Sequence, residues 1–85
     1  MPPRDWRLRV SDILDAIAAI RRYTQDMDFD AFAADRKTMD AVIRNFAVIG
    51  EAARCVPTEI TDTTRHIPWR DMREMRNVAV HAYLG

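Results

Sequence analysis

Apolar residues recur at steps of three or four positions along three stretches of this chain, and no stretch alternates apolar with polar residues over the length of a strand. Steps of three or four return to one face of an α-helix, whereas a half-buried strand needs alternation. With two glycines and four prolines among 85 residues, the chain has few places to turn. The sequence therefore predicts an all-α fold, with residues 1–85 as a single domain in a small antiparallel helical bundle.

Three long helical segments are expected from this spacing, and they span residues 5–25, 29–56 and 69–83. An acidic turn separates the first two. Asp28 or Asp30 is expected to cap the second, because a short carboxylate accepts from the free amides of a helix start. Pro57 ends that segment, and the threonine-rich stretch after it predicts a short helical turn and a loop. Pro68 suits the first turn of the third segment.

Three residues carry specific structural expectations. Gly50 lies inside the helical pattern, where glycine is unfavourable by about 1 kcal/mol relative to alanine, so we expect a close contact with another helix there. Cys55 is the only cysteine, which excludes a disulfide within the chain and indicates a reducing compartment. It is predicted to be a small core residue rather than a nucleophile. Trp69 is expected to anchor the start of the last helix in the core.

The charges give no general affinity for polyanions, because 13 basic residues balance 13 acidic ones. Twelve of the basic residues are arginine and only Lys37 is lysine. Codon bias explains this choice, and so does use of the planar guanidinium on phosphate groups, and both readings stay open. No stretch has the roughly 20 apolar residues of a membrane span, and residues 1–10 lack the apolar run of a signal peptide. We therefore expect a cytoplasmic protein without membrane association.

The last segment gathers polar side chains on one side of a helix. Its core face is formed by Met72, Met75, Ala79 and Ala82. At about 100° per residue, Asn77 and His81 fall together on the face away from the core, one turn apart. Arg76 and Tyr83 lie on the neighbouring edge. A solvated helix face can have the same composition, so the pattern alone leaves a structural and a functional reading open.

A family resemblance rests on this segment and on three upstream stretches. The run Arg76-Asn77-Val78-Ala79-Val80-His81-Ala82-Tyr83 resembles the signature of HEPN domains, most closely that of their HepT-like branch. That signature is an Arg, often followed by Asn, then a His after a short fixed spacer, and in this branch a Tyr follows two residues after the His. Residues 35–38, 41–45 and 49–52, with Trp69 and Arg70 after Ile67-Pro68, are also similar to this branch. The resemblance covers most of the chain from Arg4 onward.

The resemblance implies a homodimeric, metal-independent endoribonuclease that is the toxin of a toxin–antitoxin pair. Carried over residue by residue, Arg76 and His81 are expected to be catalytic with Asn77 in support. Tyr83 is expected to receive AMP units from an MNT-type nucleotidyltransferase antitoxin. No cofactor is implied. Members of the branch usually continue past the motif tyrosine with a further helical segment, which these 85 residues are interpreted as lacking.

Elementary chemistry is compatible with such a nuclease. RNA cleaves when its 2′-hydroxyl attacks the adjacent phosphorus, a base takes the hydroxyl proton and an acid protonates the leaving oxygen. Histidine serves in either role because it titrates near neutral pH, and arginine stabilises the charge that builds on the phosphoryl oxygens. A two-fold dimer that opposes two copies of Arg76 and His81 would supply both acid and base. His66 and His81, without a cysteine or carboxylate cluster at ligand spacing, predict no metal site.

Further candidates lie outside the motif. Arg44 and Asn45 are interpreted as a second basic wall of an RNA groove or, with Glu51, as part of a buried ion pair that orients Arg76. A purely structural Arg–Glu contact between helices stays open beside these interpretations. Arg73 ends an arginine-rich stretch, residues 65–73, that carries three arginines and one aspartate. This stretch predicts a basic strip beside the motif with salt-dependent phosphate contacts.

Two other functional readings stay open. In one, the domain is a non-catalytic interaction module that presents Tyr83 to the nucleotidyltransferase. In the other, it is a substrate-binding subunit that helps the transferase to hold a nucleotide or small molecule. Loss of RNA cleavage in His81→Ala would single out the nuclease. Partner binding that survives this change, with no modified protein in Tyr83→Phe, favours the module, and nucleotide affinity of the isolated domain favours the subunit.

Overall fold

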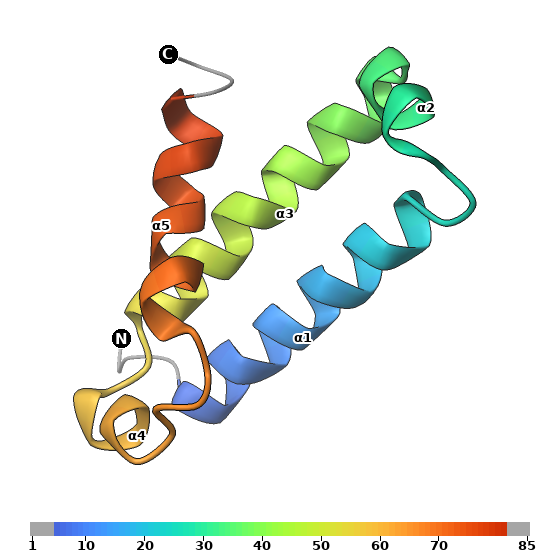
Figure 1. Ribbon diagram of the computed structural model, residues 1–85. Helices are drawn as coiled ribbons and strands as arrows, with labels where there is room; N and C mark the ends of the chain where they lie inside the picture. Colours follow the sequence, from blue (N-terminus) through green and yellow to red (C-terminus); the bar gives the residue numbers. More distant parts are fainter. Residues whose placement is uncertain (1–4, 82–85) are drawn as a thin grey trace.

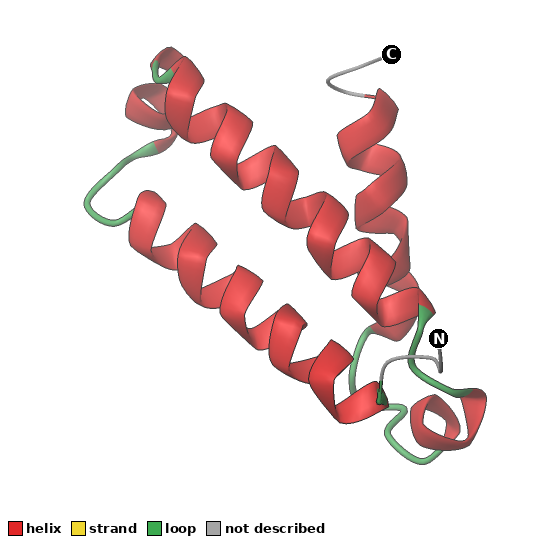
Figure 2. Cartoon of the chain, turned by 180° about the vertical axis from the view of Figure 1, so that it is seen from behind, coloured by secondary structure: helices red, strands yellow, loops and turns green. Residues whose placement is uncertain are grey.

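The computed structural model describes residues 5–81 (Figure 1). Within this range all the regular secondary structure is helical. The helices are α1 (Trp6–Tyr23), α2 (Phe29–Ala34), α3 (Arg36–Arg54), α4 (Thr58–Asp62) and α5 (Trp69–Ala79). Both α1 and α5 pack against α3. As Figures 1 and 2 show, α1 runs beside α3 in the opposite direction, and α5 turns back from the C-terminal half of α3 at an angle to it. The all-α prediction is confirmed, and α3 is the central helix of the small bundle.

Short acidic side chains begin the first two helices. The carboxylates of Asp5 and Asp28 accept backbone N–H groups, each at 2.8 Å, at the starts of α1 and α2. Asp26, with a φ of 63°, makes a left-handed turn between these helices. Asp28 is therefore the cap among the two aspartates proposed for this role. Asp30 lies in the first turn of α2, where its charge complements the helix dipole.

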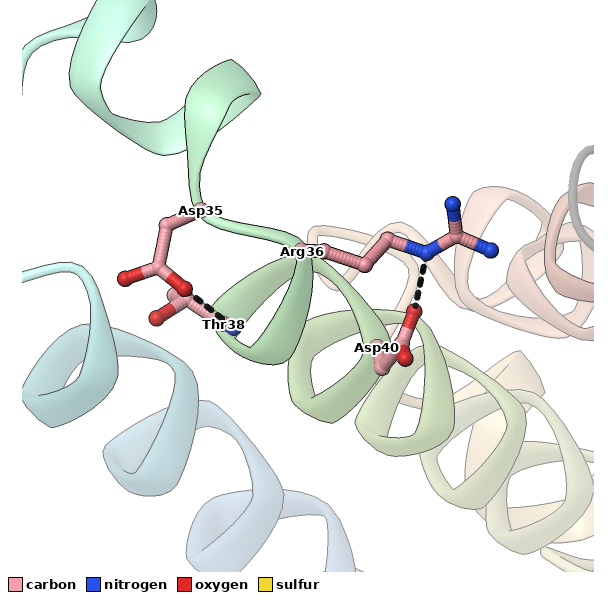
Figure 3. A network of polar contacts seen from close by, with 4 residues as sticks. All are labelled: Asp35, Arg36, Thr38 and Asp40. Atoms are coloured by element: carbon pink, nitrogen blue, oxygen red, sulfur yellow. Dashed lines mark hydrogen bonds and ion pairs between the residues drawn. The ribbon is translucent and has the colours of Figure 1, made fainter.

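The single segment predicted over residues 29–56 is wrong at Asp35, where the chain leaves helical geometry and divides the segment into α2 and α3. Asp35 has φ −103° and ψ 91°, and its carboxylate accepts from the N–H of Thr38 at 3.0 Å (Figure 3). That backbone N–H, followed by the Thr38 hydroxyl, lowers the pKa of Asp35 from its ordinary value of 3.8. In the first turn of α3, Arg36 Nε donates to Asp40 at 3.1 Å (Figure 3). A capping aspartate thus starts a new helix where four polar residues, 35–38, interrupt the apolar spacing.

The core lies where α1, α3 and the start of α5 meet. Its buried members are Ile13, Ala16, Ile49, Ala52, Ala53, Val56 and Trp69. The indole Nε1 of Trp69 donates to the Thr64 hydroxyl at 2.9 Å, which connects the loop before α5 to the core. The expectation that Trp69 anchors the start of the last helix is confirmed.

Cys55 is exposed, so its prediction as a core residue is wrong. It lies at the C-terminal cap of α3, where Ala53 and Val56 take the inward positions and Cys55 follows the exposed Arg54 on the outer side. A residue at a helix end is placed by the direction of the chain that follows, which the apolar spacing within the helix does not determine.

One side of the bundle is apolar and incompletely covered. The described residues that line an open hollow of about 380 Å³ are all apolar and come from α1, α3, α5 and the loop before α5, among them Ile13, Trp69 and Met72. Leu14, at its edge, is 61% exposed. The radius of gyration, 14.0 Å, exceeds the roughly 12 Å expected of a compact domain of this length. The described helices therefore leave apolar surface uncovered, the kind of remainder from which a dimer is expected.

Candidate active site

The backbone of Arg76 on α5 lies directly against Gly50 on α3. A Cβ atom at position 50 would stand 2.5 Å from the Arg76 nitrogen and 2.7 Å from the Arg76 Cβ, so no side chain fits between the helices there. Gly50 is buried and has an ordinary helical backbone, so its role is to permit this approach rather than to make a turn. The close helix–helix contact expected at Gly50 is confirmed, and its partner is the first residue of the Arg-Asn-His motif.

The side chain of Arg76 is held by the residue that follows Gly50. Arg76 Nε lies 3.0 Å from Glu51 Oε2 in an ion pair, and Arg54 Nη1 lies 4.0 Å from the same oxygen. Both partners of the shorter pair are about half exposed, with side-chain exposures of 44% for Arg76 and 56% for Glu51. The Arg–Glu contact between helices is therefore present, but it is not buried. The terminal nitrogens of Arg76 make no further ion pair within residues 5–81, so they can reach an external anion.

The other motif residues continue along α5. Asn77 is exposed, and its Nδ2 donates to Glu74 Oε2 at 3.1 Å. His81 is exposed in a final π-helical turn, Val80–His81, while Ala79 is buried. Asn77 and His81 are thus both solvent-accessible one turn apart, as the helical projection predicts. Tyr83 lies outside the described residues.

The two candidates on α3 occupy different positions. Arg44 is exposed and lines two shallow hollows, one shared with Glu51 and Arg9 and the other with Asn45. Asn45 is half-buried and its Nδ2 donates to the carbonyl of Ala41 at 2.8 Å, so this amide group serves its own helix. Arg44 therefore lies beside the Arg76–Glu51 pair, whereas Asn45 belongs to the neighbouring hollow.

Arginines gather on one side of α3 and α5. We call this surface the arginine face, and it consists of Arg9, Arg44, Arg54, Arg70, Arg73 and Arg76. Glu51 connects its two halves, because it lines the hollow that holds Arg9 and Arg44 and pairs with Arg54 and Arg76. Arg54 in turn lines a second depression with Arg70 and Arg73. Half of the chain's twelve arginines are on this face, although the net charge of the chain is zero.

Sequence reasoning placed only part of the arginine face. Arg44, Arg73 and Arg76 were expected to contribute to a site, and the structure places all three on this face. Arg70 belongs with Arg73 to the arginine-rich stretch over residues 65–73 that predicts a basic strip, and both line one depression. Arg9 on α1 and Arg54 on α3 come from other helices, and the packing of α1 and α5 against α3 brings them here.

Among residues 5–81, no group of three or more histidine, cysteine, aspartate or glutamate side chains is arranged to hold a metal ion. No helix in the same range is long and apolar enough to cross a membrane.

An all-α bundle whose last described helix presents Arg76, Asn77 and His81 on its exposed side fits the HEPN-like class that the motif indicates. The chain matches the family model described as "Ribonuclease HepT-like" over residues 13–85. The protein belongs to this HepT-like family, as its sequence predicts.

Curated relatives span the same region. A protein of Methanocaldococcus jannaschii named "Putative RNase MJ0127" is 40% identical over 85 residues, which are the whole of this chain and 70% of the relative. The protein named "Probable ribonuclease HepT" from Thermococcus cleftensis is 41% identical over 76 residues, or 89% of this chain and 69% of the relative. No solved structure matches the chain.

Proposed function

We propose that this chain is the toxin of a toxin–antitoxin pair, a metal-independent endoribonuclease with Arg76 and His81 as catalytic residues and Asn77 in support. Membership of the HepT-like ribonuclease family supports the nuclease class, and the names of its relatives point the same way. One observation carries the assignment to these residues. The contact with Gly50 and the ion pair with Glu51 hold an accessible guanidinium on the helix that carries His81.

The proposed reaction is a transphosphorylation within the RNA. The 2′-oxygen forms a bond to the adjacent phosphorus while the bond from phosphorus to the 5′-oxygen breaks. One imidazole takes the 2′-hydroxyl proton and another gives a proton to the leaving 5′-oxygen, which leaves a cyclic phosphate and a free 5′-hydroxyl. The terminal nitrogens of Arg76 donate to the non-bridging oxygens, where negative charge increases in the transition state.

The proposed reaction uses one imidazole as the acid and another as the base, whereas each chain has one motif histidine. The proposal therefore includes a homodimer. Val78 and Val80, which lie between Asn77 and His81 in the motif, are exposed apolar side chains. Such side chains beside a polar site suit a contact with another protein surface. The two-fold arrangement would place a second copy of Arg76 and His81 across a shared groove.

The proposed regulator is an MNT-type nucleotidyltransferase that adds AMP to Tyr83. A tyrosine two residues beyond His81 is close to the proposed phosphate position along the chain. An added nucleotide has its own phosphate, which would compete with RNA for the arginines. Modification there would neutralise the enzyme by occupying the site and by adding negative charge to it.

The decisive experiment is RNA cleavage by the purified full chain in EDTA, with Arg76→Ala and His81→Ala compared beside it. We expect the parent to cleave, and each variant to lose about two to three orders of magnitude in rate. His66→Ala is the matched control, because His66 is an exposed histidine outside the motif. Circular dichroism and size-exclusion chromatography establish that each variant is folded and in the same oligomeric state.

Two results would contradict the proposal. One is a folded dimer of the parent that leaves RNA intact, and the other is cleavage that His81→Ala retains. The interaction-module reading then takes precedence. Its test is capture of the cognate nucleotidyltransferase by the parent and by Tyr83→Phe, with mass spectrometry to detect an added AMP.

A further inference from the structure

A depression of about 390 Å³ lies along α5 beside the motif. It is lined by Arg54, Arg70, Arg73, Glu74 and Asn77. Arg70, Arg73 and Asn77 follow one another at steps of three and four, so they form one row on a single side of α5. Arg54 enters from the last turn of α3. Except for Asn77, none of these side chains belongs to the motif.

The positive charges in the depression are largely uncompensated. Within residues 5–81, Arg70 and Arg73 form no ion pair, and Arg54 comes only within 4.0 Å of Glu51. Glu74 is the one carboxylate among the lining residues, and its Oε2 also accepts from Asn77. Three guanidinium groups with one adjacent carboxylate attract an anion. Their planar donor forks match the oxygens of a phosphate group, which a guanidinium binds through two hydrogen bonds.

The row leads toward the proposed catalytic residue. One more step of four from Asn77 reaches His81, and the eleven steps from Arg70 to His81 correspond to about 16 Å of helix at 1.5 Å per residue. An extended strand of a few nucleotides covers that distance. One row along one helix can follow one phosphate backbone, and among residues 5–81 no aromatic side chain lines the depression to stack on a base.

We propose that Arg54, Arg70 and Arg73 form a phosphate-binding subsite for single-stranded RNA, which holds the backbone on one side of the bond to be cleaved. This inference rests on the proposed nuclease function. The subsite reads the phosphates and not the bases, so RNA binding is strongly salt-dependent and tolerant of sequence.

The test is binding of a short, fluorescein-labelled single-stranded RNA of mixed sequence, followed by fluorescence anisotropy. The full chain carries His81→Ala throughout, so that the probe stays intact. For single strands, each phosphate contact contributes about 0.7 to the slope of log affinity against log salt. At about 0.1 M salt this corresponds to roughly fivefold in affinity per contact. Arg70→Gln combined with Arg73→Gln should weaken binding by about 25-fold and make the slope shallower by about 1.4.

A matched control removes the same charge elsewhere. Arg21 and Arg22 are exposed in the last turn of α1 and line neither half of the arginine face. Arg21→Gln combined with Arg22→Gln lowers the net charge equally, and should leave affinity and salt slope close to those of the parent.

A second variant, Glu74→Gln, is expected to strengthen RNA binding rather than weaken it. Glu74→Gln keeps an oxygen that accepts from Asn77 but removes the negative charge from the depression. RNA binding should strengthen by about threefold, the size of one charge–charge interaction across about 6 Å of water. Glu59→Gln, an exposed glutamate on α4, is its control and should not change the affinity.

The outcomes separate this inference from the proposed function. Equal weakening by the two double-arginine variants, or unchanged binding in Glu74→Gln, would overturn the subsite. If the Arg70 and Arg73 variant keeps its RNA affinity but loses capture of the nucleotidyltransferase, the face binds protein and the inference is wrong. If the chain does not cleave RNA but the predicted binding pattern appears, the subsite stands and the nuclease proposal fails.

Discussion

Replacing Gly50 with alanine tests the contact between α3 and α5, because the contact decides whether the variant is more or less stable than the parent. Intrinsic helix propensity alone predicts that Gly50→Ala stabilises the protein by about 1 kcal/mol, because alanine suits a helix interior better than glycine. The structure predicts destabilisation instead. The new Cβ would stand 2.5 Å from a backbone nitrogen of Arg76, and a backbone atom cannot rotate away as a side chain can.

The size of the effect follows from these two opposing terms. Relieving the overlap requires α5 to move away from α3, and overpacking of this kind costs about 1–3 kcal/mol. Because the atoms in the way belong to the backbone, we take the upper half of that range. After subtracting the helix-propensity gain of alanine, the free energy of unfolding should fall by about 1–2 kcal/mol. For a domain of this size the midpoint of thermal unfolding should fall by about 5–10 °C.

Urea and thermal unfolding followed by circular dichroism measure this loss. The control is Ala18→Gly at an exposed position of α1, which reports the propensity difference in this protein without a packing change. We expect both variants to be less stable than the parent, although they exchange the same two residue types in opposite directions. An increase in stability for Gly50→Ala would refute the contact.

Three further perturbations follow from contacts described above. Glu51→Gln removes the half-exposed ion pair with α5, so we expect the free energy of unfolding to fall by less than about 1 kcal/mol and the difference to shrink at high salt. A larger, salt-independent loss in urea unfolding would contradict this. The pKa of Asp35 is lowered in the folded state, so its carboxylate stabilises the fold above its unfolded-state pKa and loses that contribution as the pH falls through the folded-state value. The stability gap between the parent and Asp35→Ala should be constant from neutral pH to about pH 5 and close below about pH 4, and a gap that widens in acid would be the contrary result. Trp69→Phe should cost about 1–3 kcal/mol from lost packing and a lost hydrogen bond, whereas Trp6→Phe at a half-buried position should cost less than about 1 kcal/mol. Equal losses in the two tryptophan variants would be evidence against the buried role of Trp69.

Local rules predicted much of this fold because they act over a few residues. The apolar spacing of α1, α3 and α5 depends only on helical geometry, and Asp28 caps α2 through an amide three residues away. The same rule applies at Asp35, which accepts from Thr38 with the same spacing. A single segment over residues 29–56 overlooks both this cap and the four polar residues 35–38, which interrupt the apolar spacing.

What the sequence could not supply depends on how the helices pack. The presence of Gly50 predicted a close approach, but not that the approaching residue is Arg76. Cys55 was placed in the core from its residue type, whereas its exposure follows from the end of α3. Arg9 and Arg54 lie far from the motif in sequence and join its surface only through tertiary contacts.

The backbone contact between Gly50 and Arg76 makes the two positions unequal in their tolerance of substitution. Position 50 accepts no side chain without displacing a helix, whereas the contact offered by position 76 consists of main-chain atoms and Cβ, which every residue except glycine retains. Alanine at position 76 therefore keeps the rotation of α5, and with it the direction in which Asn77 and the following turn point. Loss of the guanidinium can thus be separated from loss of the scaffold. In a library of random variants, substitutions at position 50 should be lost under selection for folding alone. Substitutions at position 76 should be lost only under selection for activity.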